Sequence, residues 1–145
     1  MVYELFNLLI QYHLPLLQNK TFRKHATGNF RELLIATAKD PAMLYFLDAG
    51  QNVKGAPNEN FAREIMELFT LGVGNYDEKD IREAARAFTG WNTDDLTFIV
   101  NLDKHDSGKK TVLNKTGNFN GEDVIDILSD DGYKISNIDS TMKDF

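Results

Sequence analysis

The sequence predicts a mainly α-helical, bundle-like domain with a central helical hairpin at residues 58–91 and a short β-hairpin after Trp91. Two features of the central stretch predict the helical hairpin. Its first half carries apolar residues at the spacing of a helix that buries one face, namely Phe61, Ile65, Leu68 and Phe69. A glycine-rich joint at residues 72–76 then leads to a second apolar stripe, formed by Ile81, Ala84, Ala85 and Phe88. Because the joint is short, the two helices are expected to fold back on each other.

The residues at the ends of these two helices support the assignment. Asn58 is expected to cap the first helix, because its side-chain oxygen can accept a hydrogen bond from an amide of the opening turn. Gly72 follows the last apolar residue of that helix, where a left-handed helix end is expected. Asp77 is expected to cap the second helix, and Gly90 is expected to end it.

Further helical segments are expected before the hairpin. They are Val2–Leu17, Phe22–Ala26, Asn29–Ala38 and a helix from Pro41 to near Asp48. Pro15 is expected to bend or end the first of them, because proline cannot continue the helical hydrogen bonding. Asp40 followed by Pro41 is a strong start signal for the last one. Residues 49–57 are rich in glycine and asparagine, which predicts a loop.

The pattern changes after Trp91. Leu96–Leu102 is short, apolar and β-branched, which predicts a strand, and Thr111–Leu113 is expected to pair back with it as a second strand. Residues 104–110 are expected to form the polar turn between the two. Gly121–Ser129 is expected to be helical, with its apolar residues facing inward.

The composition fits one domain and excludes several classes of protein. With 145 residues, 42% of them hydrophobic, residues 1–128 are expected to form a single domain, and residues 129–145 a divergent tail that is poorly packed or disordered. The net charge of −6 argues against nucleic-acid binding. Cysteine is absent, which excludes disulfides and thiolate metal sites. We expect neither a membrane span, which needs about 20 apolar residues, nor a signal peptide within this chain.

Several motifs of the chain are similar to motifs of one protein family. The longest is Asn58–Gly74, NENFAREIMELFTLGVG, and AARAFTGW follows at Ala84–Trp91. Shorter ones are Gly28–Leu34, Asp40–Leu44, His105–Lys110 and Lys115–Phe119. Together they resemble a large bacterial family, the domain of unknown function 1800, over about Asn19 to Leu128.

The resemblance implies a helical fold and a bacterial protein, but no reaction, because none is established for the family. Family members are usually several hundred residues long, so this chain looks like a central fragment. They often occur beside a sulfatase-like exported protein. The resemblance therefore implies a partner protein of that kind and export of the full-length relatives, while the oligomeric state and the localisation of this chain are left open.

Four residues are candidates for a catalytic or metal site. Glu64 and Glu67 lie on one face of the first hairpin helix, and a carboxylate pair of this kind can bind a divalent cation or share a proton. His105 and Asp106 would add an imidazole and a third carboxylate from a loop. Neither a Glu-x-x-His pair nor a His-Glu-x-x-His motif accompanies them.

The favoured alternative is a structural ion-pair network. Arg82 and Arg86 lie one turn apart on the second hairpin helix, so Glu64 or Glu67 can pair with them across the hairpin, or with Arg63 on their own helix. The same alternative treats His105 as a local hydrogen-bonding residue, with Asp106 fixing its tautomer.

Two functions from different classes therefore stay open. The first is an interaction or scaffold domain, which the absence of a complete catalytic constellation and the implied partner favour. The second is part of a metal-dependent hydrolase, which requires Glu64, Glu67, His105 and Asp106 to converge.

Overall fold

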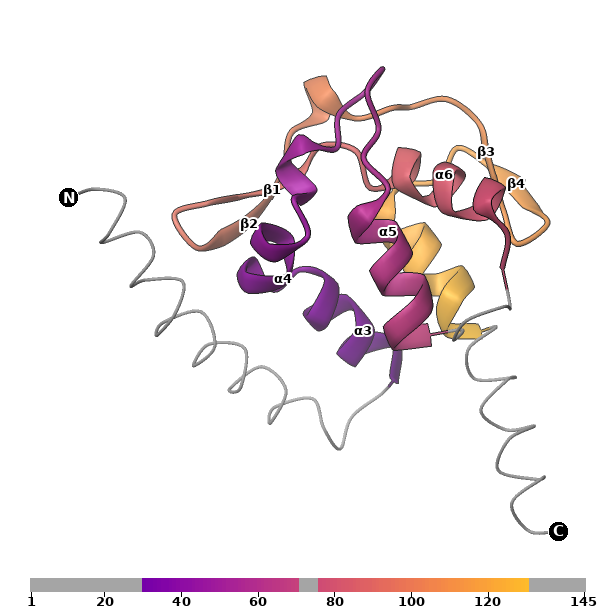
Figure 1. The fold of residues 1–145 in the computed structure, drawn as a ribbon, viewed down its shortest axis with the longest axis horizontal. Helices are drawn as coiled ribbons and strands as arrows, with labels where there is room; N and C mark the ends of the chain where they lie inside the picture. Colours follow the sequence, from indigo (N-terminus) through magenta and orange to yellow (C-terminus); the bar gives the residue numbers. More distant parts are fainter. Residues whose placement is uncertain (1–29, 71–75, 131–145) are drawn as a thin grey trace, which may run out of the picture.

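The computed structural model describes residues 30–70 and 76–130 (Figure 1). Helices and two small β-hairpins pack around one core, with the β1–β2 hairpin on one side of the molecule and the β3–β4 hairpin on the other. The expected helices at Val2–Leu17 and Phe22–Ala26, the cap at Gly72 and the tail beyond residue 130 lie outside the described residues. Within residues 30–70 and 76–130, no helix has the length and apolarity that a membrane crossing requires.

The first described helices confirm the local signals in the sequence. Helix α3 spans Phe30–Ala38, and α4 spans Pro41–Phe46. The carboxylate of Asp40 accepts hydrogen bonds from the amides of Ala42 and Met43, at 2.9 and 3.2 Å. A carboxylate in this position satisfies amides that the first turn leaves without helical partners.

A loop then crosses to the centre of the molecule, beginning with the 3₁₀ turn η2 at Ala49–Gln51. Its anchor is the buried Asn52. The Asn52 side chain donates to the carbonyl of Ala85 at 2.7 Å and accepts from the amide of Asn58 at 2.8 Å. Its backbone carbonyl accepts from the amide of Gly90 at 3.0 Å. One asparagine therefore ties the loop to the entrance of one hairpin helix and to the end of the other.

The two arms of the predicted helical hairpin pack against each other, and the first arm differs from the prediction in one respect. That arm begins as α5 at Asn60–Glu64 and continues as the π-helical segment η3 at Ile65–Thr70. The side chain of Asn58 accepts from the amide of Asn60 at 3.0 Å, close to the predicted cap. The second arm, α6, spans Glu78–Ala87 and packs against α5. Asp77 and Asp80 form a reciprocal capping box at its start.

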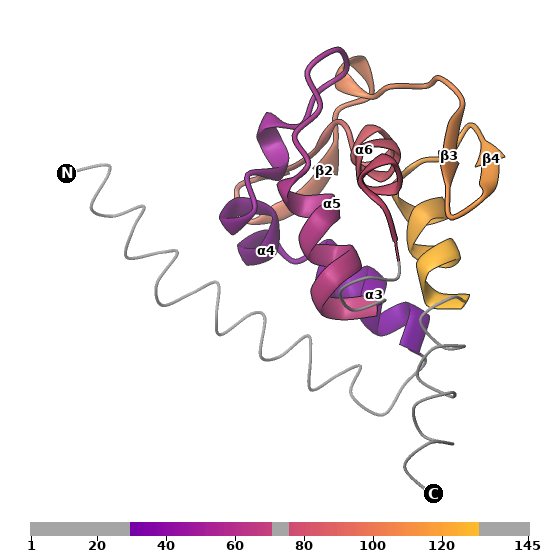
Figure 2. The same ribbon diagram turned by 45° about the vertical axis from the view of Figure 1, so that its right-hand side comes forward.

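The strands pair differently from the prediction. Strand β1 (Trp91–Asp94) pairs antiparallel with β2 (Thr97–Val100), and β3 (Lys110–Val112) pairs with β4 (Lys115–Gly117). The predicted pairing of Leu96–Leu102 with Thr111–Leu113 is wrong, because each of these strands pairs with a neighbour only two residues away. Between the hairpins lies η4, a 3₁₀ turn at Leu102–Lys104. The final described helix, over residues 121–130, agrees with the predicted one, and Figure 2 shows it beside the β3–β4 hairpin.

The prediction of a mainly α, bundle-like fold is wrong, because both hairpins contribute to the core. Trp91 of β1 packs edge-on against Phe88 and against Phe98 of β2, with ring centroids 5.0 and 4.8 Å apart. Val112 of β3 is fully buried in the same cluster as Phe61 of α5. Helices and hairpins therefore share one interior, and neither all-α nor helical bundle describes it.

Candidate functional site

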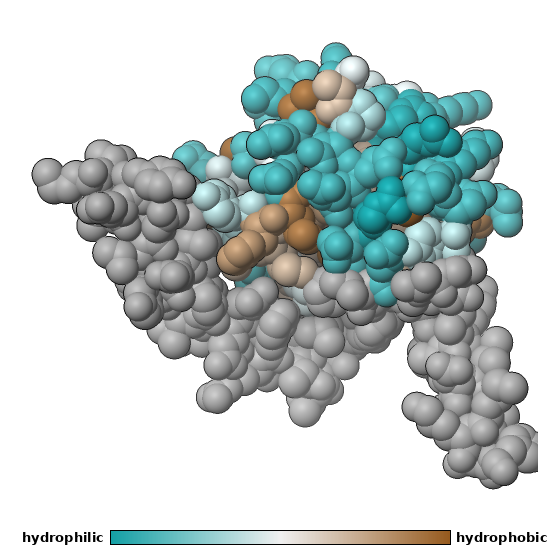
Figure 3. All heavy atoms as spheres, viewed as in Figure 1, coloured by the Kyte–Doolittle hydropathy of each residue, from teal (hydrophilic) through white to brown (hydrophobic). Residues whose placement is uncertain are grey.

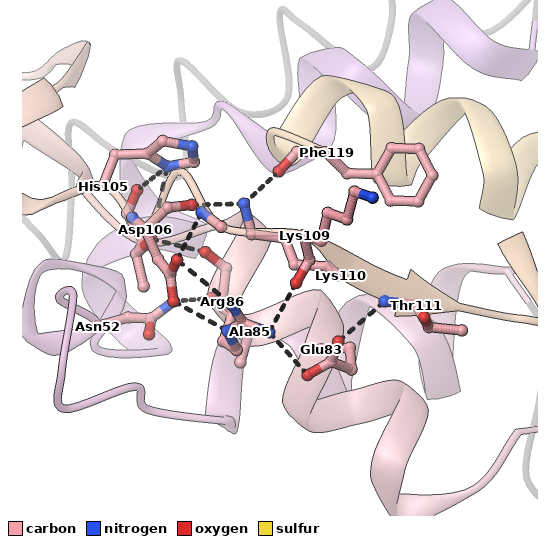
Figure 4. A network of polar contacts seen from close by, with 12 residues as sticks. Asn52, Glu83, Ala85, Arg86, His105, Asp106, Lys109, Lys110, Thr111 and Phe119 are labelled. Atoms are coloured by element: carbon pink, nitrogen blue, oxygen red, sulfur yellow. Dashed lines mark hydrogen bonds and ion pairs between the residues drawn. The ribbon is translucent and has the colours of Figure 1, made fainter. Parts of the chain in front are cut away.

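A network of polar contacts lies where the end of α6 meets the loop between β2 and β3 (Figure 4). Its centre is Arg86, in the last turn of α6. The guanidinium donates to both carboxylate oxygens of Asp106, through Nε at 2.8 Å and Nη2 at 3.3 Å. Its Nη1 donates to Glu83 and to the carbonyl of Lys109, each at 3.0 Å. A two-point arginine–carboxylate contact of this kind fixes orientation as well as charge.

Asp106 is held from several sides at once. Besides Arg86, its carboxylate accepts from the amide of Gly108 at 2.9 Å, and its own amide donates to the hydroxyl of Thr89 at 2.7 Å. The hydrogen bond from Arg86 is the main reason that the pKa of Asp106 falls to about 2. Asp106 is therefore an ionised structural acceptor at neutral pH, with its oxygens already engaged.

Acidic side chains of α6 position the strand that follows this loop. The second carboxylate oxygen of Glu83 accepts from the amide of Thr111 at 2.8 Å, and Asp80 accepts from the amide of Leu113 at 2.9 Å. Both carboxylates therefore hold β3 and the turn that follows it against α6.

Lys110 is buried although it carries an ammonium group, with 1% of its surface exposed. Its Nζ donates to the backbone carbonyl of Asp106 and, at 2.7 Å, to that of Phe119. Burial is the main cause that lowers the pKa of Lys110. These two bonds to backbone carbonyls assign Lys110 a structural role, joining the loop to the segment before the last described helix.

His105 has a defined tautomer. Its Nδ1 lies 2.9 Å from the carbonyl oxygen of Thr89, which can only accept, so Nδ1 carries the hydrogen. The Thr89 hydroxyl, 3.4 Å from the same nitrogen, already donates its hydrogen to the carbonyl of Arg86 at 2.6 Å. In the neutral ring, Nε2 is consequently an acceptor, and it points away from the network in Figure 4.

A pocket of about 210 Å³ lies beside this histidine. We call it the His105 pocket, and its lining residues are Trp91, Val100, Leu102, His105, Asn120 and Glu122. Trp91 is almost fully buried and belongs to the core, whereas Leu102 is 77% exposed. The pocket therefore combines an apolar interior and rim with three polar side chains.

The carboxylates predicted on the first hairpin helix lie in a different setting. Arg63 pairs with Glu78 at 2.9 Å and with Glu59 at 3.1 Å, while Glu67 is 4.0 Å away. Glu67 also hydrogen-bonds Tyr76, which together with the larger effect of burial raises the pKa of that phenol to about 12. Glu59 and Glu78 are therefore the close partners of Arg63, and Glu67 lies farther from it.

The other predicted pairs do not form. Arg86 pairs with Glu83 and Asp106 rather than with Glu64 or Glu67. Arg82 is exposed, and within the described part of the chain it is in none of the ion pairs. Residues 30–70 and 76–130 hold no group of three or more histidine and carboxylate side chains that could bind a metal ion. The four candidate residues are thus not brought together as one donor set.

The sequence does not predict the structural roles of Glu83, Thr89 and Lys110. Glu83 precedes Arg86 by three positions, a spacing that favours an ion pair on one helix face, so a sequence signal for it existed. The roles of Thr89 and Lys110 depend on contacts with residues brought close only by the fold, and no spacing in the sequence indicates them.

The stability of this network is expected to depend on pH. Because the folded-state pKa of Asp106 is about 2 and its ordinary value 3.8, the stabilisation is complete above about pH 5 and is lost as the pH falls towards 2. Urea unfolding of the wild type and of Asp106→Asn should therefore differ most at pH 7 and progressively less at pH 4 and 3. Asp103→Asn, an exposed neighbour, serves as the control. A wild-type advantage that is the same at all three pH values would contradict the expectation.

Comparison with known proteins assigns the chain to a family. A family model described as "Protein of unknown function (DUF1800)" matches residues 3–135. No curated protein and no solved structure matches the chain. The matched range includes both arms of the helical hairpin, the polar network around Arg86 and all residues of the His105 pocket. The chain therefore belongs to the family of proteins of unknown function DUF1800.

Proposed function

We propose that this domain is an interaction module that docks a partner protein on a surface formed by α4 and the β1–β2 hairpin. The observation that carries the proposal is the exposure of large apolar side chains there. Phe46 is 67% exposed, and Tyr45 and Ile99 are also exposed. We call these three residues the α4–hairpin surface. In Figure 3, apolar residues gather over α4 on a face that is otherwise mostly hydrophilic.

The strand register places Ile99 in the same surface as the residues of α4. Ile99 pairs with Asn92 in the hairpin, and directly paired residues point to the same face of a sheet. Asn92 in turn lines a hollow of about 410 Å³ together with Tyr45 and Phe46. Leu96, at the turn of the hairpin, packs against Ala42 of α4. The apolar side chains of both elements are therefore held next to a hollow that can receive a side chain of a partner.

The charges around this surface indicate the chemistry of the partner. Asp48, Asp94 and Asp95 are exposed. Asp48 also lines the hollow, and the other two lie at the end of the β1–β2 hairpin. A partner that inserts an apolar or aromatic side chain and surrounds it with lysine or arginine would complement both features. The sulfatase-like exported protein implied by the family resemblance is the first partner to test.

The metal-dependent hydrolase has less support. It needs a donor set with free oxygen or nitrogen atoms, yet both oxygens of Asp106 are bound by Arg86. Glu67 is engaged by Tyr76 and lies near Arg63. Within residues 30–70 and 76–130 no three such side chains are placed to hold a metal ion, so these contacts give the hydrolase alternative no support.

The test is the affinity of the purified chain for a purified sulfatase-like exported protein, measured by biolayer interferometry. Phe46→Ser should weaken binding at least about tenfold, which corresponds to about 1.4 kcal/mol, because a few anchor residues carry most of the binding energy of an interface. Ile99→Ser should weaken it less, since its side chain is 37% exposed and offers less surface to a partner.

Leu102→Ser is the matched control, since Leu102 is equally apolar and more exposed than Phe46 but lines the His105 pocket instead. It should bind the partner as the wild type does, and all three variants should keep the wild-type melting temperature. Equal affinities of Phe46→Ser and wild type, or an equal loss in Leu102→Ser, would overturn the assignment of this surface.

A further inference from the structure

The His105 pocket lies on the other face of the β1–β2 hairpin from the α4–hairpin surface. Val100 pairs with Trp91 across the hairpin, and both line this pocket. Ile99 and Asn92, one position along each strand, point to the opposite face. The two surfaces are therefore separate, and a ligand of the pocket would not compete for the same side chains as the partner protein.

The polar side chains of the pocket favour a ligand that donates hydrogen bonds. His105 donates through Nδ1 to the carbonyl of Thr89, so only the lone pair of Nε2 is available to a ligand. Glu122 offers a carboxylate that is 49% exposed and whose described ion-pair partner is Lys39. The side-chain oxygen of Asn120 is already engaged by the amide of Asp123 at 2.9 Å. Two acceptors, one of them negatively charged, therefore lie in the same hollow.

The walls of the pocket favour an organic ligand over a bare metal ion. Trp91, Val100 and Leu102 present apolar surface to the hollow, and two of them are well exposed. A divalent ion would bring bound water against these side chains and gain nothing from them, whereas a short hydrocarbon chain would remove their surface from water. A volume of about 210 Å³ suits a group of a few carbon atoms and a charged head.

We propose that the His105 pocket binds a small organic cation that carries N–H donors, such as an alkylguanidinium or an alkylammonium ion. Its charged head donates to Glu122 and to Nε2 of His105, and its hydrocarbon part lies against Leu102 and Val100. Lys39 shares the carboxylate of Glu122, so the ligand competes with that ion pair. This inference does not rest on the interaction function.

Trp91 provides the readout, because it is the one tryptophan of the chain and lines the pocket. Its fluorescence is followed while butylguanidinium is added to the full chain. Butylurea, which has the same shape without charge, and pentanoate, which is anionic, are the comparison probes. A saturable change with butylguanidinium, at least tenfold tighter than with either comparison probe, is expected. Equal responses to butylguanidinium and butylurea would overturn the proposal, since charge would then play no part.

Two substitutions separate the role of the carboxylate from that of its ion pair. Glu122→Gln should weaken butylguanidinium binding at least tenfold. Lys39→Met removes the same ion pair but leaves the carboxylate, so it should bind the probe as tightly as the wild type or more tightly. If Lys39→Met loses as much affinity as Glu122→Gln, the Lys39–Glu122 ion pair is needed only to maintain the shape of the pocket. The proposal then fails.

Three further measurements complete the test. A long-range ¹H–¹⁵N spectrum of the imidazoles, assigned with His105→Gln, should show that Nδ1 of His105 carries the hydrogen. The Nε2 resonance should shift when butylguanidinium binds. A hydrogen on Nε2 in the free protein would remove the acceptor and refute the proposal. Zn²⁺ alone should not displace butylguanidinium, and displacement would assign the pocket to a metal ion instead. Phe46→Ser should bind butylguanidinium like the wild type, so this proposal and the interaction function can fail independently.

Discussion

Gly90→Ala is expected to lower the free energy of unfolding by about 3–5 kcal/mol, from backbone strain and overpacking together. Gly90 has a φ of +87°, a conformation that residues with a Cβ atom rarely adopt. An added Cβ would also lie 2.4 Å from the backbone carbonyl oxygen of Asn101. That carbonyl cannot move freely, because the amide of Asn101 donates to the carbonyl of Gly90 at 2.8 Å. Urea unfolding followed by circular dichroism measures the loss.

Gly55→Ala is the matched control for that experiment. Gly55 has nearly the same φ, +84°, but an added Cβ would meet no atom within 4 Å. It should therefore lose only the cost of the backbone conformation, about 1–2 kcal/mol. Equal losses of unfolding free energy in the two variants would show that the contact of the added Cβ with Asn101 contributes nothing. The backbone between α6 and β1 would then have room to shift.

Arg86→Leu is expected to be the second most destabilising change, with a loss of about 2–4 kcal/mol. The substitution keeps an apolar side chain on α6 but removes every hydrogen bond from the guanidinium. It leaves the carboxylates of Asp106 and Glu83, which are 22% and 19% exposed, without their cationic partner. A carboxylate that is largely buried without a cationic partner is destabilised, and it regains hydration when it moves towards water. The loop from His105 to Lys110, which carries Asp106, should therefore lose its fixed position as well. Unfolding in urea gives the first quantity, and amide exchange in the loop gives the second.

Arg82→Leu provides the comparison, because Arg82 lies one turn earlier on the same helix and is exposed. Arg82→Leu changes net charge and helix propensity in the same way as Arg86→Leu. It should nevertheless alter the free energy of unfolding by no more than about 0.5 kcal/mol. If both arginine variants lose the same stability, the effect comes from net charge or from the helix, and the bidentate contact with Asp106 is not its cause.

The helix starts were predictable from sequence because their causes are local. Asp40 and Asp77 each cap the helix that begins right after them, through amides two or three residues away. The hairpins were not predictable in the same way. Trp91–Asp94 contains only one β-branched residue and two strongly polar ones, so it reads as a poor strand. Its pairing with Thr97–Val100 is stabilised by packing of Trp91 and Phe98 in the core, which is a tertiary effect.

The candidate site shows the same division. His105 and Asp106 were singled out from sequence, since charged residues in loops often have a role, but their partners came from elsewhere in the chain. The contact of Asp106 with Arg86 spans 20 residues. The metal-site hypothesis requires Glu64 and Glu67 to converge with them, which depends on how the hairpin and the loop pack. The face of α6 that carries Glu83 and Arg86 contacts β3 and its loop instead, which separates the two sets of residues.

The packing of α3 against the helix of residues 121–130 has a consequence for how the chain reaches its fold. Arg31 pairs with Asp126, 95 residues away, and Lys39 pairs with Glu122, 83 residues away. Contacts between such distant residues form late, and they lower the folding rate, because a long loop must first be closed. On the ribosome, α3 is made long before its partner helix, so these two ion pairs cannot form until nearly the whole described chain has been synthesised. During that interval the first half is the part most open to aggregation and to binding by chaperones.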